Sequence, residues 1–174
     1  ALSSAASDVY KRQITCDALY ERIDEVLENA KQAGIGKMLI ICTNFIEYER
    51  AEQLKEKEPE RFDIALGFHP NDLYAFQEAD YERLEELLKQ ERLAAVGEIG
   101  LDYHWEDVLP QDQKIGFIRQ IKLAQKYSRP ILIHMREATK DTLDILKEEG
   151  PIKGIMHCYS GSKEVALELI KIGF

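Results

Sequence analysis

Apolar runs long enough to cross a membrane are missing from this sequence. No run approaches the ~18 residues that a membrane-spanning helix needs, so we expect no membrane partner. Cysteine is scarce as well: there are only three, Cys16, Cys42 and Cys158, without any Cys-x-x-Cys pair. An odd number of such thiols excludes a disulfide scaffold and is typical of a reducing compartment. We therefore predict a cytoplasmic protein whose cysteines, Cys158 included, mostly fill the core.

Positive charge is also in short supply. The chain has 23 Lys and Arg residues against 32 Asp and Glu residues, a net charge of −9 over 174 residues. This balance argues against a basic surface for nucleic-acid phosphates, although a nucleic acid could still find positive charge at bound metal ions. The sequence also lacks a Gly-rich phosphate loop, a nucleophile elbow and a His-Glu-x-x-His helix, which excludes several common catalytic sites.

What the sequence does contain is a regular alternation of apolar strands and amphipathic helices. We predict strands at residues 37–43, 62–68, 93–98, 130–134 and 153–157, and helices at 17–34, 45–57, 80–90, 110–127, 138–149 and 162–172. The strands are uniformly apolar, as in a parallel sheet covered by helices. They recur about every 29 residues, and eight such units need about 230 residues, close to a TIM barrel. The fold class is therefore α/β, either an open five-stranded sheet or an incomplete (β/α)8 TIM barrel with about five central βα units.

Polar residues end several of these strands. Glu98 ends the third strand between glycines, His69 follows the second, and His134 and His157 end the fourth and fifth. The carboxyl ends of parallel strands meet at one edge of a sheet, so these side chains should converge. A cation can neutralise a buried carboxylate, and imidazoles are good ligands for divalent metals. We therefore predict that Glu98, His134 and His157 bind a metal ion.

Each of these assignments has a structural alternative. Glu98 could be a satisfied structural carboxylate, and each strand-end histidine could be bonded to backbone in the core. We assign His69 a catalytic role, although a His-Pro turn can be purely structural. Arg136, two residues past His134 on the same side of the strand, is expected to hold a phosphate oxygen of the substrate, or else to pair with a carboxylate. His104 is expected to be solvated.

Four ordered segments resemble a known family. They are GFHP (67–70), GEIGLDYH (97–104), PILIHMREA (130–138) and GIMHCYSGS (154–162), and they resemble successive signatures of the TatD family of metal-dependent deoxyribonucleases. The resemblance covers about residues 14–174 and implies an amidohydrolase-like TIM barrel. It also implies that Glu98 bridges two divalent cations, Mg, Mn or Zn, and that His134 and His157 hold the second. The implied activity is two-metal hydrolysis of phosphodiester bonds, with DNA as the expected substrate.

The sequence departs from the family pattern at both ends. A His-x-His pair that binds the first ion should fall at positions 11 and 13, where this chain has Lys11 and Gln13. A metal-binding aspartate in a Glu-Thr-Asp context should lie on a last strand, beyond Phe174. We therefore expect residues 1–13 to be a non-native or disordered tail, and residues 14–174 to be a partial barrel with at most trace nuclease activity alone. Two alternatives stay open: a non-catalytic fragment, and an amidohydrolase-like barrel acting on C–N or ester bonds, for which a carboxylated lysine in place of Glu98 would be typical.

Overall fold

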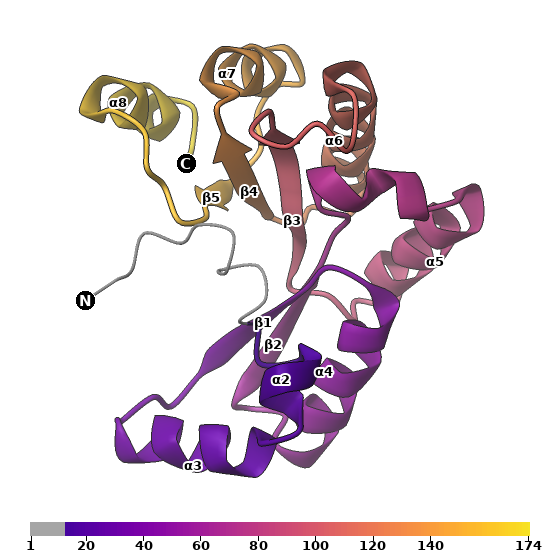
Figure 1. Cartoon of the computed structure of the whole chain (residues 1–174), viewed down its shortest axis with the longest axis vertical. Helices are drawn as coiled ribbons and strands as arrows, with labels where there is room; N and C mark the ends of the chain where they lie inside the picture. The colour runs from indigo at the N-terminus through magenta and orange to yellow at the C-terminus, as the bar shows by residue number, and fades with distance from the viewer. Residues whose placement is uncertain (1–12) are drawn as a thin grey trace. The chain divides into compact units, whose positions relative to one another are not determined.

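The computed structural model describes residues 13–174, so the tail predicted at residues 1–13 lies almost wholly outside the described residues. The described part of the chain divides into two compact units, one that ends at Ile64 and one that comprises Ala65–Phe174 (Figure 1). Within residues 13–174, no helix combines the length and the apolar character that crossing a bilayer requires.

The first unit contains α2 (Asp17–Tyr20), α3 (Ile23–Gln32), β1 (Met38–Cys42), α4 (Phe45–Lys57) and the start of β2 (Phe62–Leu66). The single helix predicted at residues 17–34 is wrong: the structure has two helices, because Arg22 lies outside helical geometry with φ −120° and ψ 27°. Helix α4 begins as its sequence indicates. The side chain of Asn44 accepts a hydrogen bond from the backbone N–H of Glu47 at 3.0 Å, the usual N-cap arrangement.

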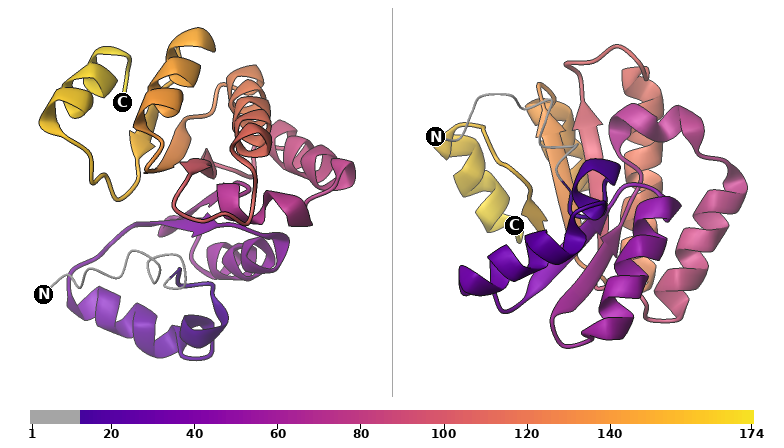
Figure 2. Two further views of the ribbon diagram at one scale, coloured as in Figure 1. Left: turned by 45° about the horizontal axis from the view of Figure 1, so that its top comes forward. Right: turned by 60° about the horizontal axis from the view of Figure 1, so that its bottom comes forward.

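The second unit contains the end of β2, η2 (Pro70–Ala75), α5 (Glu78–Lys89), β3 (Ala95–Asp102), α6 (Pro110–Lys126), β4 (Ile131–Arg136), α7 (Thr139–Glu148), β5 (Gly154–Met156) and α8 (Lys163–Lys171). Its strands pair in parallel in the order β2-β3-β4-β5. Helix α6 packs on β3 and α7 packs on β4 (Figure 2). With β1 next to β2, the five parallel strands expected from the sequence are present in chain order.

Strand β3 is longer than predicted, and this changes the position of Glu98. The sequence indicated that the strand ends at Glu98, but it continues to Asp102, and every residue of Ala95–Asp102 is buried. Ile99 and Leu101 alternate with Glu98, Gly100 and Asp102, which is the period of two that a strand requires. Glu98 therefore lies inside the strand, and Asp102 shares its face.

Two fully buried glutamines of α6 hold the backbone of the second unit in place. Gln113 and Gln120 lie about two helical turns apart, so their side chains share one face. Gln120 accepts from the backbone N–H of Phe68 at 2.7 Å and donates to the Phe68 carbonyl at 3.1 Å. Gln113 accepts from the N–H of Asp102 and donates to its carbonyl, both at 2.8 Å. Helix α6 thereby fixes Asp102 and the residue that precedes His69.

Replacing Gln120 by leucine should destabilise the fold. The substitution removes the two hydrogen bonds that Gln120 forms with the buried Phe68 backbone, and we expect a loss of about 1–3 kcal/mol in the free energy of unfolding. Gln111→Leu, at an exposed position of the same helix, is the matched control and should change stability by less than about 0.5 kcal/mol. Urea denaturation measures both. Equal effects of the two substitutions would contradict this role.

Candidate metal centre

The centre begins with two carboxylates on one face of β3. Glu98 and Asp102 are only 4% and 1% exposed. An ionised carboxylate that is buried without a partner is strongly unfavourable, so each of them needs a positive or hydrogen-bonding neighbour. Their shared face directs both toward the same neighbour on the adjacent strand.

Glycines in β3 allow that neighbour to come close. A Cβ atom at Gly100 would lie 2.0 Å from the carbonyl oxygen of His134, and the φ of Gly100 is +144°, which L side chains rarely adopt. A Cβ atom at Gly97 would lie 2.5 Å from the Cβ of Leu132. Any larger residue at either position would force β3 and β4 apart. The glycines around Glu98 therefore serve the close approach of these two strands.

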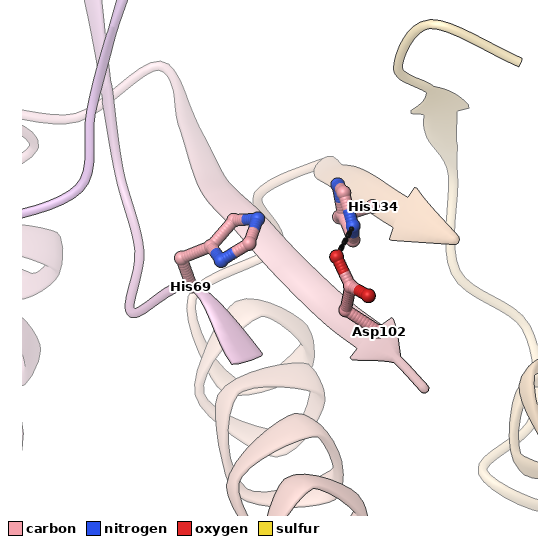
Figure 3. Close-up of side chains that lie close together, drawn as sticks. All are labelled: His69, Asp102 and His134. Carbon is pink, nitrogen blue, oxygen red and sulfur yellow. Dashed lines mark hydrogen bonds and ion pairs between the residues drawn. The ribbon is translucent and has the colours of Figure 1, made fainter. Parts of the chain in front are cut away.

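His134, on β4, lies between the two carboxylates. Its Nδ1 is 3.3 Å from Glu98 Oε1, and its Nε2 is 2.8 Å from Asp102 Oδ2, the contact drawn in Figure 3. Burial by itself lowers the pKa of His134, but the hydrogen bonds to both carboxylates outweigh it and raise the pKa to about 9. Burial likewise raises the pKa of Glu98 and Asp102, and the bonds to His134 more than reverse this, so both pKa values lie below their usual range. A protonated His134 thus offsets one of the two negative charges and bonds to both carboxylates.

His69 faces this cluster from the segment after β2. It is 3% exposed, and its ring centroid lies 4.4 Å from that of His134 in an edge-on arrangement (Figure 3). Burial, reinforced by the charge of His134, lowers the pKa of His69 to about 4. Its Nδ1 accepts a hydrogen bond from the backbone N–H of Asn71 at 3.3 Å. That bond assigns the single proton of the neutral ring to Nε2.

The arrangement of donors suits a divalent cation. One ligand atom from each of His69, Asp102 and His134 lies within 4.8 Å of the others, and Glu98 joins this group through its contact with His134. Ligand bonds of about 2.1 Å place two ligands of one ion roughly 3.0–4.2 Å apart. The 3.3 Å separation between Glu98 Oε1 and His134 Nδ1 falls within that range. Two carboxylates with imidazoles form a donor set that several divalent ions accept.

Two other residues singled out in the sequence lie beside this group. His157 directly follows β5, where its backbone N–H donates to the Ile133 carbonyl at 2.8 Å. Burial alone would raise the pKa of Glu98; His134 lowers it, and His157 adds to this effect. His157 does not belong to the group formed by His69, Asp102 and His134. Arg136 pairs with Asp102 in the β3–β4 ladder and is half-buried. Within residues 13–174 its guanidinium forms no ion pair, so the alternative of a structural salt bridge is not realised there.

His104 is exposed, as expected, and its Nδ1 contacts Glu137 Oε1 at 2.8 Å. Two points of the sequence interpretation need correction or addition. Cys158 is exposed rather than in the core, because it lies in a turn with φ 46° and strand alternation does not apply to it. Asp102 was missed altogether. The alternation of apolar and polar residues after Glu98 was the available signal for it.

Comparisons with known proteins show the family of the chain. The family model described as TatD related DNase matches residues 13–174. The uncharacterized metal-dependent hydrolase YabD of Bacillus subtilis (strain 168) is 42% identical over 87% of this chain and 60% of its own length. The 3′-5′ ssDNA/RNA exonuclease TatD of Escherichia fergusonii is 31% identical over 81% of this chain and 55% of its own length.

Solved structures lead to the same family. The crystal structure of YJJV, a TatD homologue from Escherichia coli K12, matches with a TM-score of 0.81 at 27% identity, over 92% of this chain and 62% of that one. A TatD family hydrolase from Entamoeba histolytica matches with a TM-score of 0.81 at 25% identity, over 91% and 60%. These matches confirm the α/β fold of TIM-barrel type. The chain spans about 60% of the length of the relatives that it matches. It belongs to the TatD-related DNase family.

Proposed function

We propose that this chain carries the central part of the active site of a metal-dependent phosphodiesterase that acts on nucleic acid. The observation that supports it most is the buried contact of Glu98 with His134 Nδ1 at 3.3 Å, which has the spacing of two ligands of one ion. The names of the relatives, a metal-dependent hydrolase and an ssDNA/RNA exonuclease, support the same activity. In this proposal Glu98, His134 and His157 bind divalent cations, two in an intact site, with Mg, Mn and Zn as candidates.

Asp102 has a different role in this proposal. An imidazole that gives one nitrogen to a cation carries its proton on the other. With Nδ1 of His134 facing Glu98, the Nε2 proton points to Asp102 at 2.8 Å. A carboxylate that holds the remote nitrogen of a liganding histidine fixes the orientation and tautomer of the ring. Asp102 is therefore a positioning residue for His134.

The remaining residues act on the substrate. A bound divalent cation would withdraw charge from the phosphoryl oxygens and make a water molecule a better nucleophile near neutral pH. His69, with its proton on Nε2, and the guanidinium of Arg136 are each suited to donate a hydrogen bond to a phosphoryl oxygen. A carboxylated lysine at position 98 would favour hydrolysis of C–N or ester bonds. The chain has a glutamate at this position, which supports phosphodiester hydrolysis instead. The cytoplasmic location stays a prediction, based on three free cysteines.

Loss of Glu98 should weaken metal binding. Because Gln keeps the shape of the side chain but removes its charge, we expect Glu98→Gln to lower the affinity for Mn²⁺ by at least about 100-fold, more than the loss typical of residues around the ligands. Glu137→Gln removes an exposed carboxylate just beyond β4 and should leave the affinity unchanged. Isothermal titration calorimetry measures both. Equal Mn²⁺ affinity in the wild type and in Glu98→Gln would rule out this ligand.

Two substitutions at Asp102 separate a positioning role from direct ligation. Asn can still accept the proton of His134 Nε2, so Asp102→Asn should lower Mn²⁺ affinity less than about tenfold, while Asp102→Ala should lower it about 10- to 100-fold. Nitrogen NMR of the His134 ring should show the same tautomer in wild type and Asp102→Asn, and a mixture in Asp102→Ala. Equal losses of affinity in both variants would identify Asp102 as a ligand instead.

The activity itself is tested on a single-stranded oligodeoxynucleotide with Mg²⁺ or Mn²⁺. We expect nucleotide release, whatever its absolute rate, to be abolished by EDTA and by Glu98→Gln and to persist in Glu137→Gln. Chromatography of the products measures it. Cleavage that survives both the chelator and the loss of Glu98 would show that a different site, or a contaminant, is responsible.

A further inference from the structure

The sole tryptophan of the chain lies in the loop between β3 and α6. Trp105 is 42% exposed, although tryptophan is one of the side chains that bury most surface when a protein folds. It follows Asp102, the last residue of β3, by three positions. An indole ring that stays exposed so close to the metal centre calls for a role other than core packing.

Backbone and side-chain contacts fix the start of this loop to the site. The backbone N–H of His104 donates to Asp102 Oδ1 at 3.0 Å, and the N–H of Tyr103 donates to the Arg136 carbonyl at 3.0 Å. The hydroxyl of Tyr103 donates to Asp141 at 2.7 Å. Residues 103 and 104 are thus tied to both strands of the metal centre, and the position of the next residue, Trp105, follows from them.

Two groups pack against the indole ring of Trp105. The His104 ring lies edge-on at 4.9 Å between centroids and is itself held by Glu137 at 2.8 Å. The guanidinium of Arg136 lies 5.8 Å from the centroid of the indole ring, within the range of a cation–π contact. The ring is therefore held on one side and still exposes a large part of its surface.

Arg136 places positive charge between this ring and the metal centre. It lies two residues beyond His134 on β4, so both side chains leave the same face of the strand. Its ladder partner is Asp102, whose carboxylate is already bonded to His134 and to the backbone of His104. No carboxylate in the described part of the chain pairs with Arg136. On a protein of net charge −9, an unpaired, half-buried arginine next to an exposed indole is a specific combination.

An aromatic face beside a guanidinium matches the two parts of a nucleotide. Bases stack on aromatic side chains, whereas arginine binds phosphate oxygens through its planar array of donors. We infer that Trp105 and Arg136 form a nucleotide-binding subsite, in which a base stacks on the open face of the indole and the adjacent phosphate binds Arg136. The assignment of Arg136 to a phosphate rests on the proposed function; the base-stacking role of Trp105 is additional to it.

This subsite has a consequence for the form of the substrate. A base can lie flat on a side chain only after it leaves the stack of a duplex. The subsite therefore accepts single-stranded nucleic acid, and it binds the base with little regard to its identity, since every base has a face to stack.

The single tryptophan provides a direct test that does not depend on turnover. We titrate the protein in Mg²⁺ with a nuclease-resistant tetrathymidylate and with an abasic oligonucleotide of the same length and backbone, and follow the tryptophan emission. We expect quenching by the tetrathymidylate and none by the abasic chain. By fluorescence anisotropy of labelled oligonucleotides, Trp105→Ala should bind the tetrathymidylate about 5- to 150-fold more weakly, and the abasic chain unchanged.

Two further variants control for loss of shape. Trp105→Phe keeps an aromatic face and should stay within about threefold of wild-type affinity. Tyr74→Ala removes another exposed aromatic ring of the same unit, 71% exposed, and should bind as the wild type does. An equal loss for both oligonucleotides in Trp105→Ala would indicate a structural role and overturn the subsite.

The subsite and the proposed function can fail separately. Quenching and base-dependent binding without any chelator-sensitive cleavage would uphold the subsite and count against hydrolysis of nucleic acid. Chelator-sensitive cleavage without quenching, with Trp105→Ala binding as tightly as wild type, would overturn the subsite and leave the proposed function standing.

Discussion

The burial of two carboxylates on one strand is the constraint on which the second unit depends. Glu98 and Asp102 are almost wholly excluded from water, and a fold cannot hold two such charges on one face without a positive partner between them. His134 supplies it, with one ring nitrogen toward each carboxylate. His134 stabilises the two carboxylates in this way without a metal ion. The same arrangement of the carboxylates would also suit a divalent cation.

Several features that look unrelated in the chain serve this one arrangement. Gly97 and Gly100 let β3 and β4 approach more closely than larger residues would permit. Gln113 forms hydrogen bonds with the backbone N–H and carbonyl of Asp102, and Gln120 does the same for Phe68, the residue before His69. Each is a polar or small residue in a buried place, where an apolar one would be the ordinary choice. These glycines and glutamines pack the core less well than apolar residues would. They serve instead to hold the ligand atoms of the centre in position to within a few tenths of an ångström.

The acidic character of the chain fits the proposed chemistry. A net charge of −9 repels a polyanion, so binding has to come from local positive charge rather than from a basic surface. In the proposal, divalent cations and the guanidinium of Arg136 would provide such charge at the carboxyl ends of β3 and β4. Stacking on Trp105 would add affinity that does not depend on charge and is therefore less sensitive to salt.

The sequence alone determined the α/β class, the order of the strands and the family. Strand and helix periodicities are local, and the parallel arrangement follows from uniformly apolar strands that alternate with helices. It also indicated Glu98, His134, His157 and Arg136, because the ends of parallel strands meet at one edge of a sheet. The proximity of Glu98 to His134 could be expected on this basis, although their contact distance could not.

Only the tertiary structure decided the role of Asp102, the bonds from α6 and the setting of Trp105. Asp102 lies in the candidate centre because β3 runs four residues past Glu98, and its register places Asp102 opposite Arg136, two residues beyond the pairing of Gly100 with His134. Gln120 contacts Phe68, which lies 52 positions earlier in the chain. Trp105, in the loop after β3, contacts Arg136, which lies on β4. Local sequence sets propensities within a few residues, whereas these contacts depend on the strand register and on helix packing, which the whole fold settles together.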